Sequence, residues 1–246
     1  MVLKVLISSS AGNCYILDNG KEALVIEAGV AFSEVKKAVD FDIKRIVGCL
    51  ISHEHGDHAK EAQKFLDARI PVYTSTGTAE SLGLSDKRLL AKMNDCGIYH
   101  IHNFTVQPFD VQHDAAEPFG FLIHHRETGH VLFATDTYYL AYTFKGLSNI
   151  LIECNYRQDI LDANYTAGRV PKAQRDRTIQ SHMSYDTCLQ TLQANSLRLV
   201  NKIVLIHLSD GNSNAAEFRQ GIADATGKSV HIADKGMILQ FNKTPF

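Results

Sequence analysis

The sequence lacks the features that mark several classes of protein. Its five cysteines are odd in number, scattered and never arranged as Cys-x-x-Cys, which argues against a disulfide framework and against a cysteine zinc site. Lys plus Arg number 25 against 27 Asp plus Glu, so nucleic-acid binding would have to depend on a local basic surface. No apolar run approaches the length of a membrane span, and the first ten residues do not resemble a signal peptide. We therefore expect a cytoplasmic protein without a membrane segment.

Short strands and helices alternate along the chain without an internal repeat, a low-complexity segment or a linker. Each half begins with successive strands and continues with strand–helix units. Two sheets packed face to face with helices outside would accommodate this order. We therefore predict an α/β (α+β) fold, a four-layer αββα sandwich formed by residues 1–246 as a single domain. The expected strands are 2–7, 14–17, 23–26, 46–51, 71–74, 98–102, 104–111, 119–125, 131–134, 149–152, 202–206, 229–232 and 237–241. The expected helices are one with Ser33 as its N-cap, then 59–66, 185–195 and 215–225.

The densest group of polar side chains directly follows an apolar run. His53, His55, Asp57 and His58 fall within six residues. The run is typical of a buried strand, and ligands gather at the carboxyl ends of strands in layered α/β folds. Gly56 would permit the turn that brings these side chains inward. Four such side chains would be costly to leave unpaired beside a core strand, so we favour a metal site over a histidine-rich loop.

Three later positions repeat this pattern, because each places one polar side chain just after an apolar strand: His113, Asp136 and His207. Taken singly, each has another interpretation, namely a loop residue, a helix N-cap and a core histidine. Taken together with the first group, they favour a metal centre at one edge of the sandwich. Mixed imidazole and carboxylate ligands suit zinc or manganese, and ligand type alone does not choose between them.

The segment His53-Glu54-His55-Gly56-Asp57-His58 resembles the His-x-His-x-Asp-His motif of the metallo-β-lactamase superfamily. The three later positions fall where that superfamily places its remaining ligands, so the resemblance spans almost the whole chain. It implies two divalent metal ions, zinc or manganese, with a hydroxide between them, an arrangement that activates water near neutral pH. The implied ligands are His53, His55, His113 and Asp136 for one ion, and Asp57, His58, Asp136 and His207 for the other.

Further segments are similar to the YycJ (WalJ)-like branch, whose members are regarded as DNA exonucleases. Two-zinc β-lactamases usually have cysteine in place of Asp136, and aspartate there points to phosphodiesterases and thioester hydrolases. The segment around His182 is also similar to ribonuclease Z, which implies that His182 assists the phosphate and the leaving group without binding metal. Asp57 and His182 are the candidate catalytic residues. The segments that carry the branch resemblance are Ser8 to Asn13, His113 to Pro118, Thr135 to Thr137, Glu153 to Tyr156, Ser181 to Ser184 and His207 to Ser209.

A locally basic stretch precedes His182 and is the candidate nucleic-acid contact. Its predicted substrate residues are Lys172, Arg175 and Arg177. If Pro171 opens a short helix, Lys172 and Arg175 share one face of that helix. A solvated charged helix is the competing interpretation of this stretch.

The predicted function is hydrolysis of phosphodiester bonds by a binuclear metal centre, as a DNA exonuclease of the YycJ-like kind, with nucleic acid, and DNA in particular, as the partner. A thioester hydrolase like glyoxalase II would use the same metals, but the sequence has no obvious helical domain for the thiol carrier. Ribonuclease Z-like RNA processing is the weaker alternative, because the segment after His207 does not continue as in those enzymes. A non-enzymatic metal-binding protein is disfavoured by the shared carboxylate. Glu27 stands where the family usually has aspartate, so its support of the metal ligands could differ.

Overall fold

Two seven-stranded sheets contain the strands of the computed structural model, which describes residues 1–245. The strands of the first sheet are β1 (Val2–Ser9), β2 (Gly12–Asp18), β3 (Ala23–Ile26), β4 (Ile46–Leu50), β5 (Val72–Ser75), β6 (Leu90–Met93) and β14 (Ile238–Gln240). Those of the second are β7 (Tyr99–Ile101), β8 (Phe104–Asp110), β9 (Phe119–His125), β10 (Gly129–Ala134), β11 (Leu147–Glu153), β12 (Lys202–Ile206) and β13 (Ser229–Ile232).

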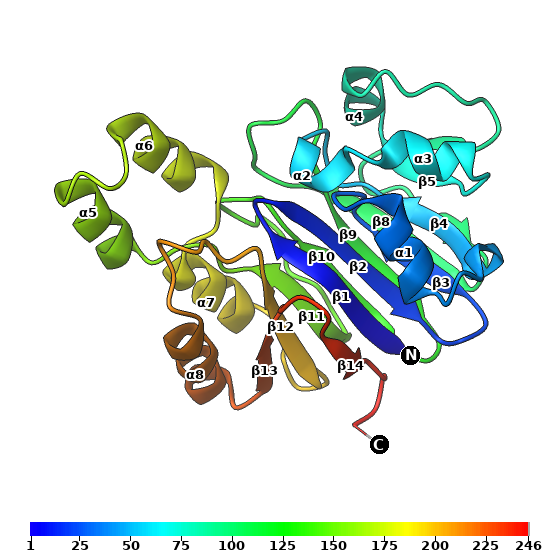
Figure 1. Ribbon diagram of the computed structural model, residues 1–246. Helices are drawn as coiled ribbons and strands as arrows, with labels where there is room; N and C mark the ends of the chain where they lie inside the picture. The colour runs from blue at the N-terminus through cyan, green and yellow to red at the C-terminus, as the bar shows by residue number, and fades with distance from the viewer. Residues whose placement is uncertain (246) are drawn as a thin grey trace.

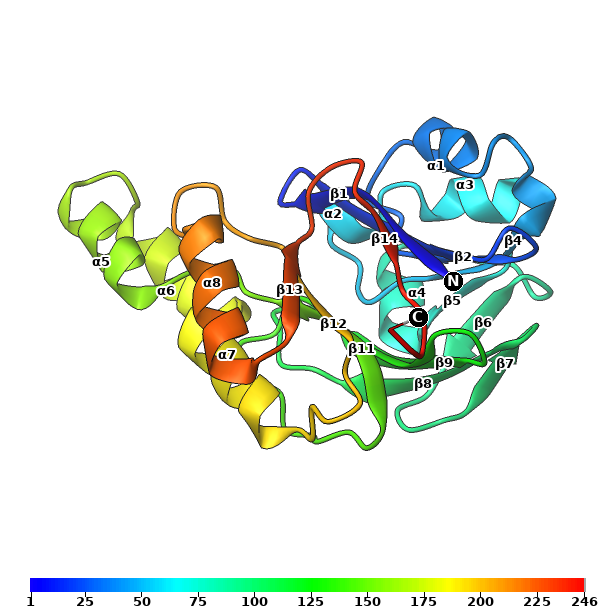
Figure 2. The ribbon, with the colours of Figure 1, turned by 90° about the horizontal axis from the view of Figure 1, so that it is seen from below.

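The helices divide between the two halves of the chain. The first half contains α1 (Phe32–Ala38), the short 3₁₀ helix η1 (Ile43–Arg45), α2 (Gly56–Ala59), α3 (Ala62–Asp67) and α4 (Thr76–Ser81). The second half contains α5 (Gln158–Thr166), α6 (Lys172–Ser181), α7 (Tyr185–Ala194) and α8 (Ala215–Thr226). The sheets face each other with helices on both outer sides (Figure 1 and Figure 2). The predicted four-layer αββα sandwich is therefore confirmed.

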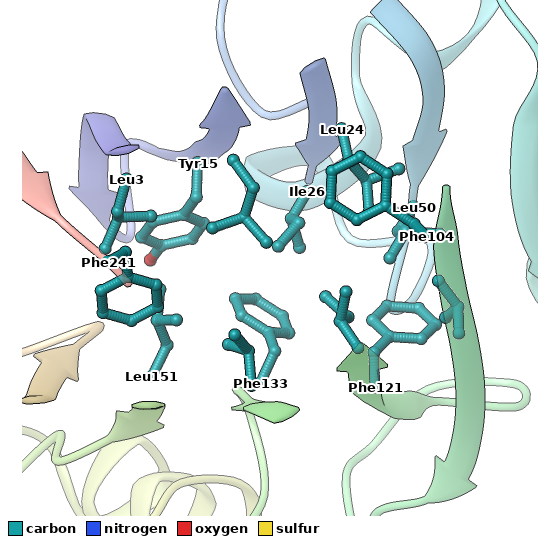
Figure 3. Packing of buried hydrophobic residues seen from close by; sticks show 14 of the residues in the cluster. Leu3, Tyr15, Leu24, Ile26, Leu50, Phe104, Phe121, Phe133, Leu151 and Phe241 are labelled. Atoms are coloured by element: carbon teal, nitrogen blue, oxygen red, sulfur yellow. The ribbon is translucent and has the colours of Figure 1, made fainter. Parts of the chain in front are cut away.

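The main core lies between the sheets. Figure 3 shows Leu3 and Tyr15 of the first sheet facing Phe121, Phe133 and Leu151 of the second, and all five are buried. Each such side chain contributes about 1.5–3 kcal/mol when it is removed from water. Separate apolar clusters join α1 and α3 to the outer face of the first sheet, and α7 and α8 to that of the second. The sheets are thus buried on both faces, which explains their nearly continuous apolar strands.

Each sheet is antiparallel at one end and parallel at the other. The strand orders are β14-β1-β2-β3-β4-β5-β6 and β13-β12-β11-β10-β9-β8-β7. Strands β3 to β6 are parallel in the first sheet, as are β10 to β13 in the second. The carboxyl ends of parallel strands meet at one edge, where polar loops can converge.

Two helix predictions need correction. The helix expected over 59–66 is divided into α2 and α3, because the backbone N–H of Glu61 donates to the carbonyl of Ala28 and leaves the helical pattern. Ser33 is not an N-cap: Ala31 takes that position, and the carboxylate of Glu61 accepts the hydrogen bond of the Phe32 N–H at 3.2 Å. The sequence analysis did not predict α4, β6 or α5.

Candidate metal centre

The histidine-rich segment connects β4 to α2. His53 and His55 lie in the loop before α2, and Nε2 of His53 lies 3.1 Å from Nδ1 of His55. Asp57 and His58 belong to α2, where Nε2 of His58 lies 3.3 Å from Oδ2 of Asp57. Gly56 begins this helix without a positive φ, and a Cβ there would meet no atom within 4 Å. Gly56 therefore permits the turn, as the sequence analysis expected, but its backbone conformation does not require glycine.

Three other loops bring side chains to the same place. His113 follows β8, and its Nε2 lies 3.1 Å from Nδ1 of His55 and 3.4 Å from Oδ2 of Asp136. Asp136 follows β10, and the same oxygen lies 3.4 Å from Nε2 of His58. His207 follows β12, with Nε2 3.4 Å from Oδ2 of Asp57. The structure thus brings together all seven side chains that the sequence predicted as ligands.

These seven side chains, together with Glu153 and His182, form three overlapping groups in which the potential ligand atoms lie within 4.8 Å of one another. The groups are His53, His55, His113 and Asp136; Asp57, His58 and His207; and Asp136, Glu153, His182 and His207. Asp136 belongs to two groups and also approaches His58 of the remaining one. Its carboxylate therefore occupies the centre of the cluster.

The donor atoms fit divalent metal ions. Nitrogen atoms about 2.1 Å from a tetrahedral zinc lie roughly 3.4 Å from one another, and Nε2 of His53 and Nε2 of His113 each lie 3.1 Å from Nδ1 of His55. Burial lowers the pKa values of His53 and His113, so these imidazoles are neutral and offer lone pairs. Neutral imidazole is the form that binds metal. Nδ1 of His58 is buried and has no hydrogen-bond partner within the described part of the chain.

The carboxylates balance positive charge on the other side of the cluster. Burial opposes ionisation of Asp136, yet the neighbouring His207 and His58 hold its pKa well below the ordinary value. Burial likewise opposes protonation of His207, but Asp136, Asp57 and Glu153 raise its pKa to about 10. The carboxylates that stabilise the protonated imidazole would equally favour a divalent cation in place of the proton, which His207 would release on binding metal.

Backbone conformation at the cluster departs from the ordinary regions. Asp136 has φ 45°, His207 has φ 55° and Glu27 has φ 68°. Left-handed backbone costs free energy in residues other than glycine, and such residues concentrate at functional sites. All three follow directly or closely on parallel strands, so the turn that leaves the sheet also sets the direction of the side chain.

Buried polar groups orient the predicted ligands. Ser52 Oγ lies 2.9 Å from Nδ1 of His53, and the carbonyl of Ser181 lies 2.9 Å from Nδ1 of His113. These contacts favour the tautomer in which the opposite ring nitrogen faces the cluster. Glu27 is fully buried, with Oε2 3.5 Å from Nδ1 of His58.

Glu153 is a site residue that the sequence analysis missed. Its buried carboxylate accepts hydrogen bonds from the backbone N–H groups of Thr137 and Met183, and its Oε1 lies 2.7 Å from Nδ1 of His182. This carboxylate raises the pKa of His182 against the opposing effect of burial. Glu153 could have been predicted as a site residue from the sequence, because it is the last residue of an apolar strand, and Asp136 and His207 follow such strands closely.

The predicted substrate residues lie on α6, which Pro171 precedes as the sequence predicted. Lys172 pairs with Asp176, and Arg175 pairs with Asp162. Lys172 and Arg175 do not line the cavity that adjoins the cluster. Arg177 does belong to that wall, so the three residues do not form one surface toward the site.

Comparison with known proteins agrees with this geometry. The sequence profile of the metallo-beta-lactamase superfamily matches residues 9–137, more than half of the chain. Exodeoxyribonuclease YycJ of Bacillus anthracis is 26% identical over 228 residues, which cover 85% of this chain and 83% of that protein. Exodeoxyribonuclease WalJ of Streptococcus pneumoniae is 26% identical over 230 residues, covering 85% and 82%.

A solved structure shows the same fold. The metallo-beta-lactamase fold protein YhfI of Bacillus subtilis superposes with a TM-score of 0.72 at 16% identity, covering 96% of this chain and 98% of that one. The resemblance to the YycJ (WalJ)-like branch, predicted from the sequence, is confirmed by the curated relatives. The chain belongs to the metallo-beta-lactamase superfamily, and it is a hydrolase of that superfamily.

Proposed function

We propose that this protein is a binuclear metal-dependent phosphodiesterase that acts on DNA as an exonuclease. The observation that carries the proposal is the position of Asp136, whose carboxylate lies between two groups of potential ligands. His53, His55, His113 and Asp136 would hold one divalent ion, and Asp57, His58, Asp136 and His207 the other. Zinc and manganese both suit this donor set. When bound, the two ions would lower the pKa of water and offset charge on the phosphate.

His182 would act on the substrate. Its Nδ1 is engaged by Glu153 at 2.7 Å, which leaves Nε2 for a phosphate oxygen or for the departing alkoxide. The carboxylate raises the pKa of the imidazole, so His182 can carry a proton at neutral pH and donate it to the leaving group. Asp57 would act through the metal that it binds.

DNA is proposed as the substrate because the curated relatives are named exodeoxyribonucleases. A cavity lined by arginine beside the cluster is also better suited to a phosphate backbone than to the uncharged carbonyl of a thioester. A cytoplasmic location is part of the proposal. No helix in the described residues is long and apolar enough to span a membrane.

The experiment compares end-labelled duplex DNA, single-stranded DNA, RNA and S-lactoylglutathione, each with manganese and with zinc. We expect shortening of DNA from an end, and no more than slow turnover of the thioester. The Asp136→Ala variant, purified in parallel, excludes a contaminating nuclease. Absence of phosphodiester cleavage under every condition would overturn the proposed function, and RNA cleavage without DNA cleavage would favour ribonuclease Z-like processing.

A further inference from the structure

A cavity of about 640 Å³ adjoins the proposed metal centre, since His182 and His207 belong both to its wall and to the cluster. The other walls come from the α5–α6 pair, through Asn164, Arg169 and Arg177, and from the segment after β12. Figure 1 shows α5 and α6 extending to one side of the sandwich. Sites that enclose a small ligand commonly measure about 300–1,000 Å³. The cavity is therefore large enough for one nucleotide.

Arg169 differs from the other arginines of this helical pair in its charge environment. Arg175 forms an ion pair with Asp162, and Arg177 forms one with Asp114 at 2.9 Å. Within residues 1–245, no carboxylate lies within ion-pair distance of Arg169. Its charge is thus available to a ligand in the cavity, whereas those of its neighbours are largely compensated.

Arg169 is nevertheless held in position. Its Nη1 donates to Oδ1 of Asn164 at 2.9 Å, and its backbone N–H donates to the Asn164 carbonyl. Asn164 is buried, and its Nδ2 donates to the carbonyl of Gly211 and to Oδ1 of Asn212. These bonds connect the guanidinium to the segment that follows His207. The N–H groups that remain can bind the oxygens of a phosphate in the planar geometry that arginine favours.

We propose that the cavity encloses the terminal nucleotide of the strand being cut, and that Arg169 binds the phosphate one nucleotide away from the scissile bond. The inference rests on the proposed function and specifies its substrate class: a strand end that carries a second phosphate. A terminal phosphate held by Arg169 would place the end of the strand beside the metal centre and so favour cleavage there.

The test uses three dithymidine substrates that each contain one phosphodiester bond. TpT has no terminal phosphate, pTpT has one at the 5′ end and TpTp has one at the 3′ end. We expect the wild type to prefer one of the phosphorylated substrates. Arg169→Gln should raise the KM for that substrate about 10- to 100-fold, because a hydrogen bond between charged groups is lost. Its kcat, and both constants for TpT, should change by no more than about twofold, since contacts of equal strength in ground and transition states affect KM alone.

Arg126→Gln is the matched control, because it removes the same charge from an exposed position between β9 and β10. Arg126 lies near the end of β1 that is remote from the cluster. Its neighbour Glu127 contacts the amino group of Met1, just before β1, whereas Ser8, near the other end of β1, accepts the hydrogen bond of the His207 N–H. The control variant should match the wild type on all three substrates. Arg169→Lys should recover only part of the preference, because lysine retains the charge without the two-pronged geometry.

The outcomes separate this inference from the proposed function. An equal loss by Arg169→Gln on TpT and on the phosphorylated substrates would overturn the role of Arg169. So would unchanged kinetics, a wild type without preference for a terminal phosphate, or a wild type that cleaves a longer oligonucleotide but no dinucleotide. In each of these cases phosphodiester hydrolysis would stand. A wild type that cleaves neither the dinucleotides nor a longer single strand would overturn the proposed function itself.

Discussion

Nδ1 of His182 lies 2.7 Å from Oε1 of Glu153, and the same carboxylate accepts two backbone hydrogen bonds, from Thr137 and Met183. Glu153 is thus held by the loop that follows β10 and by the segment between α6 and α7. A histidine held in this way can present its other nitrogen to a substrate without searching rotamers. The contact supports the function proposed for His182 beside the candidate metal centre.

His182→Ala should reduce kcat for phosphodiester cleavage by roughly 10²- to 10⁴-fold, the contribution typical of a positioned general acid. Metal content should remain that of the wild type, because His182 is proposed to contact substrate only. Steady-state kinetics and metal analysis on the same preparation test both statements. A variant that loses metal would show that His182 is a ligand.

Glu27 should affect metal binding through His58. Its buried carboxylate lies 3.5 Å from Nδ1 of His58, which has no hydrogen-bond partner within the described residues. Glu27→Gln removes the acceptor charge and should weaken metal affinity about 10- to 100-fold. Glu27→Asp retains a carboxylate and should stay closer to the wild type. Competition with a chelator measures the affinities, and equal values for the Gln variant and the wild type would refute this role.

The two glycines beside the cluster should respond differently to alanine. A Cβ at Gly29 would lie 1.7 Å from the carbonyl oxygen of Asp57, and backbone cannot yield cheaply, whereas a Cβ at Gly56 would meet nothing within 4 Å. Gly29→Ala should therefore lower the free energy of unfolding by about 3 kcal/mol or more, and Gly56→Ala by less than about 0.5 kcal/mol. Urea denaturation of the two variants provides the comparison, and similar losses would argue against the observed close approach.

Asp18 should make folding stability depend on pH. Its side chain accepts hydrogen bonds from Lys4 and Arg45, both at 2.9 Å. Burial opposes ionisation, but Lys4, Gly20 and Arg45 hold the pKa of this carboxyl below its ordinary value. The ionised form therefore stabilises the fold above the ordinary pKa of about 3.9, and this contribution is lost as the pH falls through the lower value in the folded state.

Asp18→Asn should accordingly lower the free energy of unfolding by about 1–3 kcal/mol at pH 7. The difference from the wild type should shrink as the pH falls below about 3.9. Denaturant titrations at a series of pH values measure this difference. A difference that stays constant down to the acid limit of folding would contradict the assignment.

Much of the fold could be predicted because the strands have continuous apolar sequence. The predicted bounds of β9 and β12 coincide with the observed ones. The sequence did not predict α5, since this helix buries Leu161 and Asn164 while most of its other residues stay polar and accessible. Such a helix depends on packing against α6, which a local pattern does not reveal.

The proposed ligands could be predicted because each lies just after a strand, where chain direction and sheet topology bring loops together. Glu153 follows the same rule, but it ends β11 and was interpreted only as part of a sequence motif. Arg169 could not be distinguished from Lys172 or Arg175 by sequence, because the difference is the carboxylate partner that each finds in the folded chain. Whether a basic side chain is available to a ligand therefore depends on whether a carboxylate pairs with it in the folded chain.

The central claim, two metal ions that share Asp136, is tested most directly by metal content. Wild type and Asp136→Ala would be loaded with zinc or manganese, freed of excess ion and measured by elemental mass spectrometry. We predict two ions per chain in the wild type and almost none in the variant, because each proposed site loses a ligand at once. A wild type with a single ion, or an Asp136→Ala protein that keeps both, would contradict the account.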